Sequence, residues 1–159
     1  MDHVHAPTVV LGAGAMGSAA AYHLARRGEP VWLVEQFAVG HDRGSSHGAA
    51  RITRHSYADP HCARLMPEAF RAWRQLEADA AQSLYLRTGG ITFCRPGDDY
   101  VARVTENLEA TGIPHRRMTG AALNRVVSGF ALPDDTDVVF EPDAGMLAAA
   151  RAVRVQVEL

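Results

Sequence analysis

The feature that most constrains this chain is a glycine-rich turn placed between a short apolar run and a helical stretch. Residues 8–11 are apolar or β-branched, and residues 12–17 follow at once with the pattern G-x-G-x-x-G. A helical stretch then runs to Arg27, and a second apolar run over 31–34 ends at Glu35. This order of strand, turn, helix, strand and acid predicts a βαβ unit.

Each part of this unit suits a dinucleotide. The first glycine allows a tight turn, the second lets the backbone approach a pyrophosphate, and the third lets the helix pack on the strand. Amides at the helix N-terminus attract phosphate anions, and an acid at the end of the second strand accepts hydrogen bonds from a ribose hydroxyl. A glycine-rich turn without a ligand is the alternative. The candidate cofactor-binding residues are Gly12, Ala13, Gly14, Ala15, Met16, Gly17, Glu35 and Gln36.

The composition excludes several classes of function. A chain of 159 residues with 47% hydrophobic residues suits one globular domain, and a net charge of −2 without a long basic run argues against a nucleic-acid partner. Cys62 and Cys94 lack metal or redox spacing, and no run is long and apolar enough for a membrane span. We therefore expect a cytoplasmic protein without a metal. All 16 basic residues are arginine, so no lysine of this chain can form a Schiff base.

Periodicity along the rest of the chain predicts further helices and strands. Helical patterns cover 61–80, 98–110, 120–126 and 147–159, and the first carries an apolar stripe that includes Leu65 and Leu76. Residues 36–48 read as a loop. Extended patterns cover 84–86, 91–93 and 138–140, with turns at 88–90 and 141–145. Only one βαβ unit is evident, and the later strands are spaced like an inserted antiparallel layer. The predicted fold is α/β, with an incomplete Rossmann-like sheet.

A second dense motif covers residues 44–57, with the sequence GSSHGAARITRHSY. Two arginines, Arg51 and Arg54, follow a serine- and glycine-rich loop that ends near His47. Loop amides and hydroxyls can bind phosphate, and guanidinium groups bind phosphate or carboxylate through paired hydrogen bonds. A solvated basic turn explains the composition equally well.

Together with FEPDAG at residues 140–145, these motifs resemble the monomeric sarcosine oxidase family and its N-methyltryptophan and pipecolate oxidase relatives. These are FAD-dependent amine oxidases. The resemblance implies that the βαβ glycines and Glu35 hold the ADP part of FAD, and that a loop follows the pyrophosphate toward the flavin. That loop contains Ser45, Ser46 and His47. The resemblance further implies that Arg51 lies against the flavin, that Arg54 binds the substrate carboxylate, and that His47 and Tyr57 lie near the reacting centre.

The resemblance also implies an activity. Family members oxidise the C–N bond of a secondary amino acid, N-methyl or cyclic, with O2 as acceptor and H2O2 as product; they are often monomeric. It implies an FAD-binding βαβ and flavin loop over 1–60, a helix and the start of an antiparallel-sheet substrate domain over 61–146, and a helix returning to the FAD domain over 147–159. Because family members are more than twice this length, we expect an N-terminal, truncated portion that is inactive alone. A non-catalytic dinucleotide-binding fragment and an NAD-dependent dehydrogenase are the alternatives.

Overall fold

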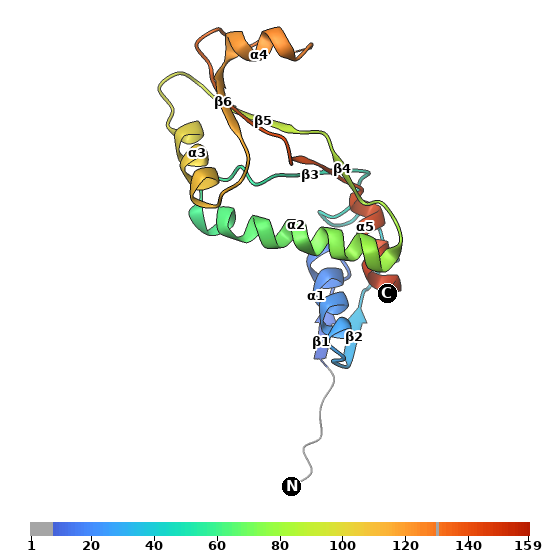
Figure 1. The fold of residues 1–159 in the computed structure, drawn as a ribbon. Coiled ribbons are helices and arrows are strands. Elements are labelled where there is room, and N and C mark those ends of the chain that lie inside the picture. Colours follow the sequence, from blue (N-terminus) through green and yellow to red (C-terminus); the bar gives the residue numbers. More distant parts are fainter. Residues whose placement is uncertain (1–7, 130) are drawn as a thin grey trace. The chain divides into compact units, whose positions relative to one another are not determined.

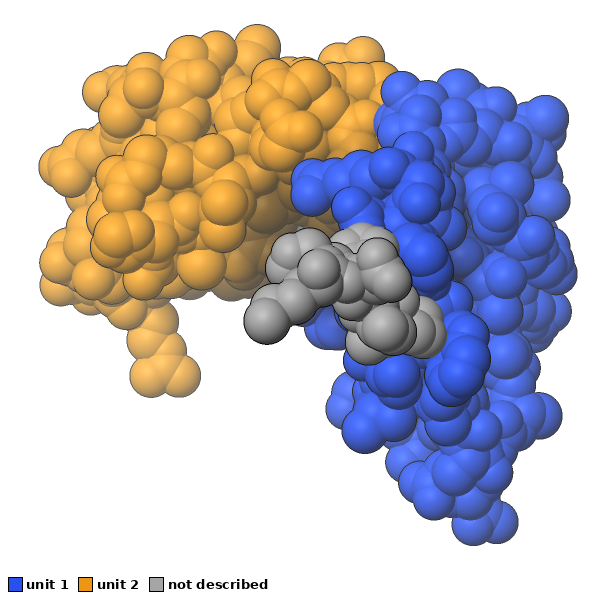
Figure 2. Space-filling model, turned by 90° about the horizontal axis from the view of Figure 1, so that it is seen from below, with its two compact units in different colours: residues 1–51, 75–84, 147–159 blue, residues 52–74, 85–146 orange. Residues whose placement is uncertain are grey.

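The computed structural model describes residues 8–129 and 131–159, and these residues divide into two compact units (Figures 1 and 2). Unit 1 contains residues 1–51, 75–84 and 147–159, of which 1–7 lie outside the described part, and unit 2 contains 52–74 and 85–146. The chain therefore leaves unit 1 and returns to it twice. The predicted regions 1–60, 61–146 and 147–159 are a functional division and stay a prediction.

Unit 1 contains the βαβ unit that the glycine motif predicts. Its elements are β1 (Thr8–Leu11), α1 (Ala15–Arg26), β2 (Val31–Val34) and α5 (Ala149–Glu158). β1 and β2 are parallel, with Thr8 opposite Val31, and α1 packs on both strands (Figure 1). α1 also contacts α5, where the Ser18 hydroxyl donates to Gln156 Oε1 at 2.8 Å, with both side chains buried.

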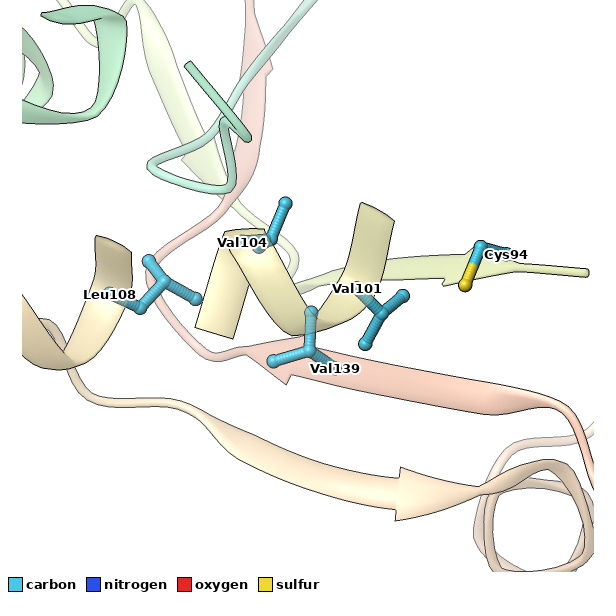
Figure 3. Close-up of a cluster of buried hydrophobic side chains, with 5 residues drawn as sticks. All are labelled: Cys94, Val101, Val104, Leu108 and Val139. Atoms are coloured by element: carbon cyan, nitrogen blue, oxygen red, sulfur yellow. The ribbon is translucent and has the colours of Figure 1, made fainter. Parts of the chain in front are cut away.

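Unit 2 is built on an antiparallel sheet, as the spacing of the later strands predicts. β5 (Gly90–Cys94) and β6 (Arg116–Thr119) both pair with the central strand β7 (Asp137–Glu141). α3 (Tyr100–Ala110) covers this sheet with an apolar face that is fully buried at Val101, Val104 and Leu108 (Figure 3). These side chains meet Val139 of β7 and Cys94 of β5, which explains the burial of that cysteine.

A second three-stranded sheet has the order β3–β8–β4, formed by Arg51–Thr53, Gly145–Leu147 and Tyr85–Arg87. The two extended runs around 88–90 therefore belong to different sheets, because β4 pairs with β8 and β5 pairs with β7. Gly89, with φ +70°, therefore lies where the chain passes from one sheet to the other, and not in a hairpin turn. At Gly90, an added Cβ would lie 2.5 Å from the Cβ of Ala144, so the crossing requires glycine.

The helices agree with their predicted ranges within a few residues. α2 covers Pro60–Ala80, with residues up to 74 in unit 2 and the rest in unit 1, and α4 covers Gly120–Val126. The Thr119 hydroxyl accepts the Ala122 N–H at 3.3 Å and so caps α4. The prediction of an apolar stripe along α2 is wrong at the start of the helix, because Leu65 is 67% exposed, whereas Leu76 is 1% exposed. Strands β3, β6 and β8, each three or four residues long, were not predicted.

Candidate functional site

The glycine turn in unit 1 has the geometry that its sequence predicts. Gly12 adopts φ +92°, and its N–H donates to the Val34 carbonyl at 2.7 Å, which ties the ends of the two strands together. A Cβ on Gly17 would lie 1.8 Å from the Gly12 carbonyl oxygen. Glycine is therefore required at Gly17 for α1 to begin this close to β1.

Glu35 faces the glycine turn from the end of β2. Its Oε2 accepts the Ala13 N–H at 2.8 Å, and its Oε1 accepts the Phe37 N–H at 3.1 Å. The hydrogen bond from Ala13, with the one from Phe37, lowers the pKa of Glu35 below its ordinary value, so this side chain is an anionic acceptor at neutral pH. His41 also reaches it, with Nε2 at 3.5 Å from Oε1.

These residues line a hollow of about 450 Å³ in unit 1. Seven of the predicted cofactor-binding residues lie on its wall: Gly12, Ala13, Gly14, Glu35, Gln36, Ser45 and Ser46. The wall also includes His41 and Arg43, which sequence reasoning missed. The Arg43 guanidinium carbon lies 4.7 Å from the centroid of the Phe37 ring, so a cation stands beside the hollow. Its place one residue before the Gly-Ser-Ser run was the available signal.

Five predicted cofactor residues do not line this hollow: Ala15, Met16, Gly17, His47 and Arg51. The Ala15 N–H, at the start of α1, donates to Ser46 Oγ at 2.9 Å, which brings the serine loop onto the helix N-terminus. The Met16 side chain is 86% exposed, and Gly17 serves the packing of α1. Glycines without side chains, helix amides, serine hydroxyls and a carboxylate acceptor together are the donor set that a dinucleotide requires. The residues present therefore fit the ADP part of a dinucleotide cofactor.

Arg51, which follows the serine loop in the chain, binds carbonyl groups of that loop. Its guanidinium donates to the carbonyls of Ser45 at 2.6 Å, His47 at 2.7 Å and Ala50 at 2.8 Å. The His47 ring is exposed, with Nδ1 at 2.5 Å from the Gly44 carbonyl. Arg51 and His47 thus belong to unit 1 together with the hollow.

Arg54 and Tyr57, the other two predicted catalytic residues, belong to unit 2. The Arg54 guanidinium carbon lies 5.3 Å from the centroid of the Tyr57 ring, and both side chains are half-buried. Arg54 and Ser56 line a second hollow, of about 220 Å³, with Gly89 and Gly90. The structure therefore brings the four predicted residues together as two pairs, one in each unit.

Comparison with known proteins decides the family. A model of the family described as "FAD dependent oxidoreductase" matches residues 8–158. The chain belongs to this family. The cofactor of the FAD-dependent oxidoreductases is FAD, which argues against the NAD-dependent alternative.

Several sarcosine oxidases are similar to this chain. Monomeric sarcosine oxidase of Bacillus sp. (strain NS-129) is 34% identical over 98% of this chain and 41% of its own length. Human peroxisomal sarcosine oxidase is 32% identical over 92% of this chain and 37% of its own. The chain thus spans about two fifths of the length of these relatives.

Solved structures show the same fold. NikD, an amino acid oxidase of nikkomycin biosynthesis, superimposes with a TM-score of 0.79 at 22% identity, covering 95% of this chain and 39% of NikD. L-proline dehydrogenase from P. horikoshii gives 0.79 at 22% identity, covering 96% of this chain and 41% of its own. This agreement confirms the predicted α/β fold. Within residues 8–129 and 131–159, no helix is long and apolar enough to cross a bilayer.

Sequence reasoning also missed a buried polar group in unit 2. Glu141, which the sequence places at the start of a turn, is the last residue of β7 and is 1% exposed. Its carboxylate accepts hydrogen bonds from His55 and Ser56. The Phe-Glu-Pro motif at 140–142 was the available signal, but its partners lie more than 80 residues away along the chain.

Proposed function

We propose that this chain supplies the FAD site and part of the amine site of an oxidase that acts on the C–N bond of a secondary amino acid. The observation that carries the proposal is the position of the 44–57 motif. Its first part lines the hollow beside the glycine turn, and its last part places Arg54 over Tyr57. The 32–34% identity to sarcosine oxidases over nearly the whole chain supports the same substrate class.

In this proposal, unit 1 binds the cofactor. Glu35 accepts from the ribose hydroxyls, and the amides at the start of α1 face the pyrophosphate. Ser45, Ser46 and His47 would follow the cofactor toward its flavin end, where Arg51 holds the carbonyls of Ser45 and His47. When bound, FAD would supply the redox chemistry, which is acceptance of a hydride equivalent from the amine and its transfer to O2 as H2O2.

The substrate contact comes from unit 2. The Arg54 guanidinium binds the carboxylate of the amino acid through two parallel hydrogen bonds, which fixes the direction of the adjacent C–N bond. Tyr57 supports that guanidinium through its ring, and His47 lies near the reacting centre. The amino acid loses a hydride from carbon and a proton from nitrogen, two electrons and two protons in all, as its C–N bond becomes an imine. Water then hydrolyses the imine to an amine and a carbonyl compound. We propose the cytoplasm as the location.

The test uses the protein as its gene encodes it, including any residues outside these 159. Purified protein is denatured and the released chromophore identified by absorption. H2O2 is then measured with sarcosine, N-methyltryptophan and pipecolate. Released flavin and peroxide from one of these amino acids support the proposal. Colourless protein, or NADH formation instead of peroxide, contradicts it.

A second candidate is a non-catalytic FAD-binding protein. The observation that favours it is that the residues lining the dinucleotide hollow all belong to unit 1, whereas Arg54 and Tyr57 belong to unit 2. Bound flavin without peroxide from any of the three amino acids selects this candidate.

A further inference from the structure

Glu141 is a carboxylate of unit 2 that is 1% exposed to solvent. Its Oε1 accepts the His55 backbone N–H at 2.8 Å and lies 2.5 Å from His55 Nδ1. Its Oε2 accepts the Ser56 backbone N–H at 3.1 Å and the Ser56 hydroxyl at 2.6 Å. Burial by itself would raise the pKa of Glu141, but the hydrogen bonds from His55 and Ser56 outweigh it and hold that pKa below its ordinary value. The carboxylate therefore stays charged and bound to two consecutive residues.

This arrangement holds backbone rather than side chains alone. Two successive N–H groups that point at one anion form a concave site with a defined backbone conformation. The His55 ring is held on its other side too, because it stacks on Phe70 with a centroid distance of 3.9 Å and an interplanar angle of 14°. An apolar residue in place of Glu141 could fill the same volume, but it could not orient two amides.

The held residues lie between Arg54 and Tyr57. Arg54 directly precedes the first amide bound by Glu141, and Tyr57 directly follows the second. Ser56 and Arg54 also line the same hollow of about 220 Å³. The torsion angles at positions 55 and 56 therefore set where the Arg54 guanidinium and the Tyr57 ring lie relative to each other.

We infer that Glu141 is a positioning residue for substrate binding, which fixes the 54–57 turn so that Arg54 meets the substrate carboxylate in one geometry. The inference rests on the proposed role of Arg54 in the function described above. Glu141 is 1% exposed and lines neither the hollow of unit 1 nor the hollow beside Arg54. Its loss leaves the guanidinium present but spread over several orientations, and binding that depends on orientation then weakens.

The central experiment is Glu141→Gln in the protein as its gene encodes it, loaded with FAD. Glutamine keeps the shape and one acceptor oxygen, but it turns an N–H donor toward the donors of Ser56. We expect KM for the oxidised amino acid to rise roughly tenfold, while kcat changes less than about twofold and the flavin content is unchanged. Binding of N-acetylglycine, an unreactive carboxylate, followed through the flavin absorption, weakens by a similar factor.

Two variants accompany it. Asp143→Asn changes a carboxylate two residues away that is 41% exposed and pairs with Arg87 at 2.9 Å, and it should leave KM unchanged. Ser56→Ala removes one donor to Glu141 and should raise KM roughly threefold. It decides the question if Glu141→Gln does not fold, since an unchanged KM in Ser56→Ala then overturns the inference.

Combination with Arg54→Ala separates this inference from the proposed function. If Glu141 acts through Arg54, the double variant raises KM no more than Arg54→Ala alone. If the double variant instead raises KM by the product of the two single effects, the role of Glu141 is overturned and the proposed function stands. The same holds if Glu141→Gln lowers thermal stability but leaves KM unchanged. An unchanged KM in Arg54→Ala overturns the assignment of Arg54 and the inference with it.

Discussion

At the scale of single residues, Gly17 shows how a backbone contact sets a requirement for one amino acid. The Gly12 carbonyl oxygen would lie 1.8 Å from any Cβ at Gly17. Because this oxygen belongs to the backbone, it cannot move aside as the end of a flexible side chain could. We therefore expect Gly17→Ala to push α1 away from the turn, with a cost of about 1–3 kcal/mol and at least a tenfold weaker affinity for FAD.

The measurements are a denaturation curve and a fluorescence titration with FAD. Gly28→Ala is the matched control, because Gly28 has φ +78° but no atom within 4 Å of its Cβ position and lies outside the hollow. It should lower stability through strain alone and leave FAD affinity unchanged. Normal FAD binding by Gly17→Ala would show that the turn can widen without harm.

Arg54 is the second residue whose chemistry can be tested singly. A guanidinium that binds a carboxylate by two hydrogen bonds is worth about 1.5–3 kcal/mol, which corresponds to a tenfold to hundredfold change in affinity. Arg54→Ala in the protein as encoded should therefore raise KM for the amino acid by that factor and leave flavin bound. Arg51→Ala is the contrasting variant, since Arg51 holds the carbonyls of Ser45 and His47 and should affect flavin retention instead.

At the scale of elements, the end of β7 contributes a pH-dependent part of the stability of unit 2. Since hydrogen bonds hold the pKa of Glu141 below its ordinary value of 4.5, this contribution is fully present above about pH 4.5. It is lost as the pH falls through the lower pKa of the folded state. Denaturant midpoints between pH 7 and pH 3 should fall more steeply for the native chain than for Glu141→Gln. Equal slopes would rule out a charged Glu141 in the folded state.

Elements also show which local patterns could be predicted. The turn over 88–90 contains two glycines between two extended runs, and its local sequence fits a hairpin. The structure instead places β4 and β5 in different sheets, because their partners β8 and β7 begin 60 and 47 residues later in the chain, respectively. A three-residue strand such as β8 carries too little periodicity to be recognised without its partner.

At the scale of the whole molecule, the two-stranded sheet of unit 1 leaves one apolar face exposed. Val9, Leu11, Trp32 and Val34 are 49–79% exposed, and the register places Val9 beside Trp32 and Leu11 beside Val34. A two-stranded sheet is marginal by itself, and an apolar face of this kind marks a contact or aggregation surface. We expect the 159 residues expressed alone to bind a hydrophobic dye, to aggregate and to make no peroxide.

The double change Leu11→Gln and Trp32→Gln should lower dye fluorescence strongly. Leu65→Gln, at a position of α2 that is 67% exposed, serves as the control and should lower it little. A monomer with a sharp cooperative melt, no dye binding and measurable peroxide would contradict this view of the exposed face.

The sequence by itself determined the βαβ unit, the order of the helices and the FAD-type turn. These depend on local causes: positive φ at Gly12, the absence of a side chain at Gly17, and apolar residues at helical or strand spacing. Only the tertiary structure decided the sheet partners of β4 and β5, the separation of His47 and Arg51 from Arg54 and Tyr57 into two units, and the burial of Glu141 on His55 and Ser56. Those features depend on contacts between residues far apart in the chain. Such contacts form, and stabilise the structure, only once the chain has folded, and no short segment of the sequence contains both partners.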